Sequence, residues 1–125
     1  MRKKLSKTYQ KHSARMRRVK TIQKRIYGTE DVPRLSVFRS AKNISGQIIN
    51  DDAGKTLVSM STLAKGLDID QKMKRTEKSF EIGKKLGEKA IAAGITKVCF
   101  DRAGFLFHGR VKAFADGARK AGLEF

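Results

Sequence analysis

The first 27 residues of the chain contain no aspartate or glutamate, although they hold 11 of its 29 lysines and arginines. Residues 28–125 carry the other 18 basic residues and all 12 acidic ones, so most of the net charge of +17 lies at the N-terminus. Cations without acidic neighbours repel one another and oppose compaction until a polyanion neutralises them. The missing acids therefore predict a basic arm, residues 1–29, ahead of one globular domain, residues 30–125.

The sequence also has only one cysteine and no long apolar stretch. A single cysteine excludes a disulfide within the chain and agrees with a reducing compartment. Cys99 lies in the apolar run VCF, which predicts a small buried residue rather than a reactive thiol. No segment resembles the apolar core of a signal peptide or could span a bilayer. We therefore expect a soluble, cytoplasmic protein without a membrane partner.

The residue patterns of most catalytic and metal sites are missing as well. Two histidines and one cysteine, without CxxC or HxxxH spacing, cannot form a closed zinc site. The GxxxxGK[ST] order of a phosphate-binding loop is absent, and residues 81–125 contain no serine that could act as a nucleophile. We expect no catalytic residue, no metal, no cofactor and no small-molecule substrate.

Two enzymatic alternatives stay open at this point. His108 could act as a general base, because Asp101 and Arg102 lie near it in the sequence. A metal-dependent nuclease would instead need several converging carboxylates, whereas Asp51 and Asp52 lie in a turn and Asp101 lies far from them along the sequence of the sheet. The simpler interpretation makes Asp51 and Asp52 turn formers and Asp101 a cap at the end of a strand.

The domain begins with three short segments that alternate apolar and polar residues. They read RLSVFRS, ISGQIIN and TLVSMS, and the turns AKN and DDAGK join them. A period of two with brief turns predicts three antiparallel strands in a meander. Leu35 and Val37 should then lie on one face of the sheet, with Phe38 on the other.

The second half of the domain changes to helical periodicity. A helix is expected from about Met73 to Ala93, with Phe80, Gly83, Gly87, Ala90 and Ile91 on its buried side and Ile82 and Leu86 widening the stripe. The two glycines suggest close approach of this helix to the sheet. The run TKVCF predicts a buried strand, and Val111 to Ala121 predicts a second amphipathic helix.

These elements predict an α/β fold in the order βββαβα with a basic N-terminal extension. A strand that is reached through a helix usually pairs in parallel with its neighbour. We therefore expect a mixed sheet, in which a parallel strand joins the antiparallel meander and two helices pack on it. The fourth strand is expected beside the first.

The segment FDRAGFLFHGRVK, residues 100–112, combines aromatic rings with cations. Phe105 and Phe107 share a side if the segment is extended, whereas Leu106 faces the other way. The two rings could bury apolar surface beneath the second helix. They could instead stack on unpaired bases, because Arg102, His108, Arg110 and Lys112 surround them. Both interpretations stay open for each ring.

The basic arm indicates a nucleic acid as the partner. A solvated face normally mixes both signs of charge, and a membrane anchor needs an apolar face that the arm lacks. Its thin apolar stripe predicts a disordered or fraying helix when the arm is alone, and a longer helix on RNA.

Three segments of the sequence resemble one known family. They are KRIYGT at the end of the arm, PRLSVFRSAKNI, and GITKVCFDRAGFLFHGRVKAFADGARKAGLEF. These motifs are long, span nearly the whole chain, and are similar to those of the bacterial L18 family of large-subunit ribosomal proteins. The resemblance implies a body with a ribonuclease-H-like topology but without its catalytic carboxylates. It also implies a structural role in translation, in which the protein binds 5S rRNA and helps attach it to 23S rRNA in the central protuberance, beside other 5S-binding ribosomal proteins.

The predicted RNA-binding residues come from the charge pattern of the arm and from the resemblance. In the arm they are Arg2, Lys3, Lys4, Lys11, Arg15, Arg17, Arg18, Lys20, Lys24 and Arg25. In the domain they are Arg34, Phe38, Arg39, Ser40, Lys42, Arg102, Phe105, Phe107, His108, Arg110 and Lys112. The chain departs from the family pattern at Phe105 and Phe107, where tyrosine is usual, at Ala103, where glycine is usual, and at Ser45, where an aromatic residue is usual. Stacking by the two phenylalanines is still expected, but hydrogen bonds from phenolic hydroxyls are not.

Overall fold

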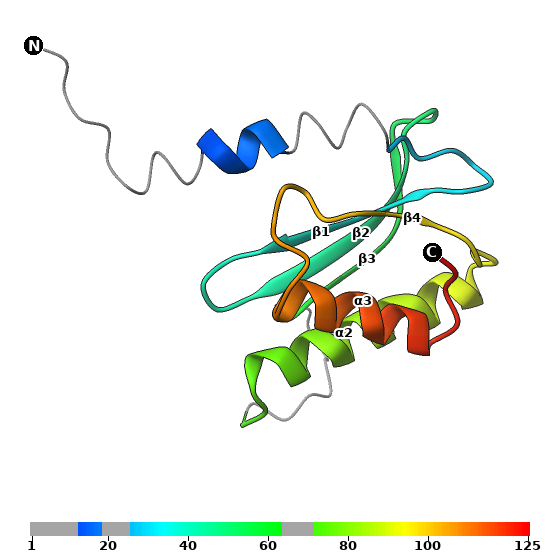
Figure 1. The fold of residues 1–125 in the computed structure, drawn as a ribbon. Coiled ribbons are helices and arrows are strands. Elements are labelled where there is room, and N and C mark those ends of the chain that lie inside the picture. Colours follow the sequence, from blue (N-terminus) through cyan, green and yellow to red (C-terminus); the bar gives the residue numbers. More distant parts are fainter. Residues whose placement is uncertain (1–12, 19–25, 64–71) are drawn as a thin grey trace, which may run out of the picture.

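A computed structural model describes residues 13–18, 26–63 and 72–125 of the chain. A short helix occupies residues 13–18 of the arm (Figure 1). In the domain the elements follow in the order β1 (Arg34–Arg39), β2 (Ile44–Asn50), β3 (Lys55–Ser61), α2 (Arg75–Ala92), β4 (Cys99–Asp101) and α3 (Arg110–Lys120). The predicted α/β fold and its βββαβα order are confirmed.

The sheet has four strands in the order β3-β2-β1-β4. β1 pairs with β2 and β2 with β3 in the antiparallel direction, and Leu35 lies opposite Ile48. β4 pairs with β1 in parallel, with Leu35 opposite Phe100. The predicted mixed sheet is therefore confirmed, as is the expected place of the fourth strand beside the first.

The core lies between one face of the sheet and the two helices. Leu35 and Val37 are fully buried on that face, against Ile82, Leu86 and Phe114. The side chains of a strand alternate, so Phe38 lies on the opposite face, where it is 54% exposed. Figure 1 shows α2 and α3 on one side of the sheet and the helix of residues 13–18 on the other. We call the face away from α2 and α3 the open face.

The helices pack against each other at glycines. A Cβ atom at Gly83 would collide with the Phe114 carbonyl oxygen, and one at Gly117 would collide with the Phe80 carbonyl oxygen. A Cβ atom at Gly87 would come within 2.6 Å of the Ala121 Cβ. The glycines of α2 thus permit close approach to α3. The prediction that they serve close approach to the sheet is wrong.

Two other details differ from the sequence-based expectations. The centre of the buried face of α2 is Ile82 and Leu86, whereas Ile91 is 38% exposed and Phe80 is only half-buried. α2 contacts both the sheet and α3, so its buried residues are centred between these two contacts. The buried face predicted from the sequence was therefore rotated about the helix axis relative to the observed one. The fourth strand is also shorter than TKVCF, since Lys97 forms only an isolated parallel bridge with Glu124.

Candidate nucleic-acid interface

The described part of the arm docks on the loop that follows β4. Arg15 Nη1 donates a hydrogen bond to the Ala103 carbonyl oxygen at 3.2 Å, and Arg18 Nε donates one to the Gly104 carbonyl oxygen at 2.6 Å. Residues 13–18 form a helix at this contact, whereas residues 1–12 and 19–25, which make up most of the arm expected to be disordered or fraying, lie outside the described residues. The two bonds tie the helix of residues 13–18 to the β4–α3 loop.

Phe105 lies at the centre of this contact. The Cζ atoms of Arg15 and Arg39 lie over its ring, at 4.6 Å and 5.2 Å from the centroid. The ring of Phe38 meets it edge to face at 5.9 Å, and Phe105 itself is only 9% exposed. Cations over an aromatic face are attracted by its quadrupole. These four residues, Arg15, Phe38, Arg39 and Phe105, form an arginine–phenylalanine cluster at the open face.

Phe107 lies in a different environment. Its ring meets Phe100 edge to face at 5.7 Å, and Phe100 in turn stacks on Phe125 at 5.4 Å. Phe100 packs against the core, so Phe107 is on the helix side of the sheet and remains 42% exposed. Phe105 and Phe107 were expected to share a side only if their segment is extended. Residues 102–109 form turns and bends instead, and the two rings lie on opposite sides of the sheet.

Substituting each ring should separate their roles. Phe105→Ala should lower the free energy of unfolding by about 3 kcal/mol, because it empties an enclosed site. Phe107→Ala should cost less than about 1 kcal/mol of stability but reduce RNA affinity by about 1 to 3 kcal/mol for a lost stacked base. Urea unfolding and RNA titration measure the two effects. Leu106→Ala, at a side chain that is 65% exposed, is the control and should change neither quantity. Equal stability losses at 105 and 107 would contradict this division.

The backbone conformation of the β4–α3 loop is unfavourable for the alanine at position 103. Ala103 has φ of 53°, in the left-handed region, and is followed by Gly104 at 78°. A left-handed conformation costs an L-residue about 1 to 2 kcal/mol, whereas glycine adopts it freely. This geometry gives a physical reason for glycine at this position.

Ala103→Gly should therefore stabilise the protein by about 0.5 to 1 kcal/mol, after the extra backbone entropy of glycine is subtracted. Thermal or urea unfolding measures the change. Ala113→Gly, in the regular helix α3, should destabilise by about 1 kcal/mol and serves as the opposite-sign control. Loss of stability in both variants would show that residue 103 is not left-handed in solution.

Arg34 bridges two carboxylates that are far apart in the sequence. Its Nη1 lies 2.7 Å from Asp101 Oδ2, while its Nε and Nη2 lie 3.0 Å and 3.1 Å from the two oxygens of Asp51. Asp51 also accepts a hydrogen bond from the Gly28 N–H at 2.7 Å, and Asp101 Oδ1 accepts one from the Ala103 N–H at 2.8 Å. Asp51 and Asp101 therefore converge, but a guanidinium lies between them and fixes both turns. This geometry favours a structural role for Arg34 over the predicted RNA contact.

The bridge should make stability depend on acid pH. The Arg34 guanidinium has the largest effect and lowers the pKa of Asp51 below its usual value of 3.8. Burial opposes it by a smaller amount, and the Gly28 N–H lowers the pKa further. The stabilisation is present in full above pH 4 or so and is lost as pH falls through the lowered pKa. We expect the free energy of unfolding to fall more steeply between about pH 4 and pH 2 in the wild type than in Asp51→Asn. Parallel curves for the two proteins would show that the pair contributes nothing.

Of the other predicted RNA-binding residues of the domain, some have exposed side chains and others form hydrogen bonds or ion pairs within the protein. Arg39, Lys42 and His108 are exposed or lie at exposed turns, whereas Ser40 Oγ accepts the Asn43 N–H at 3.2 Å within the β1–β2 turn. Arg102 Nη1 donates to the Phe105 carbonyl oxygen at 3.1 Å. Lys112 forms an exposed pair with Asp116 at 3.6 Å.

The predicted arm residues are only partly within the described chain. Arg15 and Arg18 contact the 103–105 loop, and Arg17 is exposed on the same helix. The remaining seven lie outside the described residues: Arg2, Lys3, Lys4, Lys11, Lys20, Lys24 and Arg25.

Catalytic chemistry finds little support in this geometry. Across residues 13–18, 26–63 and 72–125, no three histidine, cysteine or carboxylate side chains gather as metal ligands. Cys99 is half-buried instead of fully buried as predicted, and burial raises the pKa of its thiol, which disfavours the thiolate. In the same described segments, no helix is long and apolar enough to cross a membrane.

The sequence interpretation missed two cations near the interface. Arg75 and Lys78, in the first turn of α2, lie beside Lys42 and Arg110. Their signal was the run KMKRTEK, which places four cations and one acid around a helix start. Helix N-termini usually favour acids, so such a run indicates a function other than helix stability.

Comparisons with known proteins agree on one family. The model described as ribosomal L18 of archaea, bacteria, mitochondria and chloroplasts matches residues 9–125. A protein of Desulfotalea psychrophila named large ribosomal subunit protein uL18 is 48% identical over 121 residues, which cover 97% of this chain and all of the relative. Its namesake in Thermotoga petrophila is 50% identical over 118 residues, or 92% of this chain and 95% of the relative. The namesake in Clostridium botulinum is 49% identical over 112 residues, or 90% and 92%.

Proposed function

The chain belongs to the L18 family of large-subunit ribosomal proteins, and we propose that within the ribosome it binds 5S rRNA and helps attach it to 23S rRNA in the central protuberance. The protein is a structural, non-enzymatic constituent of the large ribosomal subunit. Its task is to position RNA, and no bond is made or broken.

One observation supports the proposal most strongly: the arm and the β4–α3 loop meet at the arginine–phenylalanine cluster. Arg15 from the arm and Arg39 from β1 lie over the same ring, Phe105, at the open face. A cationic surface interleaved with aromatic rings suits the phosphates and unstacked bases of RNA. α2 and α3 cover the other face of the sheet, and only the short helix of residues 13–18, among the described helices, lies on the side of the open face (Figure 1).

In this proposal residues 1–29 act as an RNA-binding arm and residues 30–125 as the body that aims it. Lysines and arginines of the arm neutralise phosphates, which gives affinity but little sequence preference. The docked helix of residues 13–18 sets the direction of the arm relative to the body. Arg39, Lys42, His108 and Arg110 contact RNA from the body, and the exposed rings of Phe38 and Phe107 are the candidates for stacking on bases.

Reconstitution of the large subunit tests the attachment of 5S rRNA. Particles assembled from 5S rRNA, 23S rRNA and the other proteins should contain much less 5S rRNA when this protein is omitted. Adding it back should restore the 5S content, which a sedimentation gradient with RNA quantification measures. Equal 5S content with and without the protein would contradict the proposal.

A further inference from the structure

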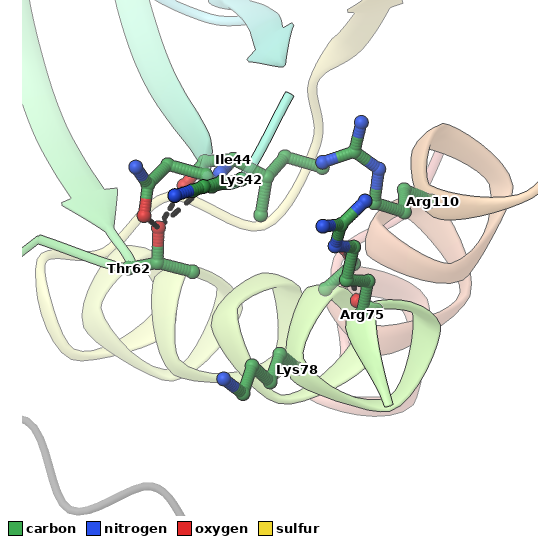
Figure 2. A pocket seen from close by; sticks show the side chains of 8 residues that line it. Lys42, Ile44, Thr62, Arg75, Lys78 and Arg110 are labelled. Carbon is green, nitrogen blue, oxygen red and sulfur yellow. Dashed lines mark hydrogen bonds between the residues drawn. The ribbon is translucent and has the colours of Figure 1, made fainter. Parts of the chain in front are cut away.

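A narrow hollow lies where the β1–β2 hairpin meets the starts of α2 and α3 (Figure 2). Eight residues line it: Lys42, Asn43, Ile44, Thr62, Arg75, Lys78, Ser79 and Arg110. Four of these side chains are cationic, and in the described part of the chain no acidic residue is among them. Figure 2 shows Arg75 and Arg110 on one side of the hollow and Lys42 with Thr62 on the other. We call it the anion pocket.

The neutral polar groups of the pocket satisfy one another. Thr62 Oγ1 donates to Asn43 Oδ1 at 3.0 Å and accepts the Ile44 N–H at 3.2 Å. Ser79 Oγ donates to the Arg75 carbonyl oxygen at 2.8 Å. These bonds make a fixed wall, so a bound group would be held mainly by the charged side chains around it.

The cationic side chains of the pocket lie where positive charges repel one another. Burial, and then the charges of Arg39 and Arg75, lower the pKa of Arg110 from its usual value. Arg75 and Arg110 also begin their helices, at the end where the helix dipole favours anions, and α3 has no acid in its first turn. Throughout residues 13–18, 26–63 and 72–125, neither arginine forms an ion pair with a carboxylate. A bound anion would reduce both the repulsion between the arginines and their unfavourable interaction with the positive ends of the helix dipoles.

The size of the pocket restricts what can enter. Its enclosed part has a volume of about 10 Å³, close to that of one water-sized sphere. A phosphate oxygen can occupy that space, whereas a base or an aromatic ring cannot. Arginine forks match the geometry of phosphate oxygens in paired hydrogen bonds.

We propose that the anion pocket binds a backbone phosphate of RNA, held by Arg75 and Arg110 on one side and Lys42 on the other. This inference rests on the proposed function. RNA is favoured over an acidic protein as the partner because the pocket is continuous with the proposed RNA-binding surface: Arg110 lies near Arg39 of the arginine–phenylalanine cluster. The RNA contact would thus extend from the open face, around the hairpin end of the sheet, to the start of α2. Arg75 is the new member of the RNA-binding set.

The full-length Arg75→Gln variant tests the pocket. Its affinity for 5S rRNA should fall about tenfold at physiological salt, as for one lost charge-assisted hydrogen-bonding group. The slope of log binding constant against log salt should decrease by about 0.7 to 0.9, as for one lost phosphate contact. Arg75→Lys should keep the slope and recover part of the affinity, because it restores the charge but not the fork. Lys120→Gln, which removes one exposed charge at the far end of α3, is the matched control and should change neither value.

The pocket is refuted if Arg75→Gln and Lys120→Gln give the same slope and affinity while both melt like the wild type. Should Arg75→Gln fail to fold, Lys42→Gln applies the same test from the exposed hairpin, with the same expected and contrary results. An unrelated RNA of equal length, titrated in parallel, separates this inference from the proposed function. A wild type that does not distinguish the two RNAs defeats the 5S assignment, yet the slope comparison still decides the pocket.

Discussion

Deletion of residues 1–27 is expected to flatten the dependence of log binding constant for 5S rRNA on log salt concentration by several units. The deleted segment holds 11 cations and no acid. Each phosphate that a cation neutralises contributes about 0.7 to 0.9 to the slope, because condensed counterions are released. Titrations at four or more salt concentrations give the slope directly. A slope that does not change would show that the arm makes no phosphate contact.

A double variant separates the charge of the arm from its docking. Arg15→Gln with Arg18→Gln removes two charges and both hydrogen bonds to the 103–105 loop. Its slope should fall by no more than about 2, as for two lost phosphate contacts. Its affinity should fall further than two exposed charges explain, because the arm is no longer directed. Affinity losses equal to those of Lys97→Gln with Lys120→Gln, at two exposed lysines outside the predicted RNA-binding set, would show that docking is unimportant.

Gly83→Ala should destabilise the protein, although alanine is the better helix former. Helix propensity alone would favour alanine by about 1 kcal/mol. The new Cβ would meet the Phe114 carbonyl oxygen and lie 3.0 Å from the Phe114 Cα, and backbone atoms of α3 cannot move aside without separating the helices. Overpacking of this kind costs about 1 to 3 kcal/mol or more, so the expected net loss is on the order of 2 kcal/mol. Urea unfolding measures it.

The sign of the change makes this test decisive for the helix contact. Glu88→Ala, at an exposed position of the same helix, should stay within about 0.5 kcal/mol of the wild type. Gly117→Ala should resemble Gly83→Ala, because its Cβ would meet the Phe80 carbonyl oxygen from the other side. Stabilisation by Gly83→Ala would mean that propensity dominates and that the helices are not in close contact there.

The sheet could be predicted from the sequence because its signals are local. Alternation in RLSVFRS and ISGQIIN places Leu35 and Val37 inward and Phe38 outward, and the structure confirms each position. The turn DDAGK contains Gly54 at φ of 61°, as its composition indicates.

The errors arose where two surfaces compete for one element. Spacing along α2 shows a stripe of small and apolar residues, but it does not show whether the sheet or α3 covers them. Gly83 indicated close approach correctly, and the partner it approaches is Phe114 of α3. The half-buried Phe80 and the exposed Ile91 follow from the same competition.

The candidate site depends on contacts between distant segments, which a single sequence does not reveal. Arg34 is separated from Asp101 by 67 positions, and Arg15 from Ala103 by 88. Composition alone could therefore mark Arg34 as a cation but not as the bridge between two carboxylates. The sequence does not show whether residues 102–109 are extended, since only backbone geometry shows that Ala103 has a positive φ.

In our proposal the docked arm and the body together select 5S rRNA, and a binding competition is the sharpest test of this selection. Labelled 5S rRNA bound to the full-length protein is challenged with unlabelled 5S rRNA or with an unrelated RNA of equal length, at one fixed salt concentration. We expect 5S rRNA to compete at a concentration at least about 1000-fold lower than the unrelated RNA, by analogy with the usual ratio of specific to non-specific nucleic-acid binding. Equal competition by the two RNAs would contradict the claim, because it is the behaviour of a general polycation that compacts any nucleic acid.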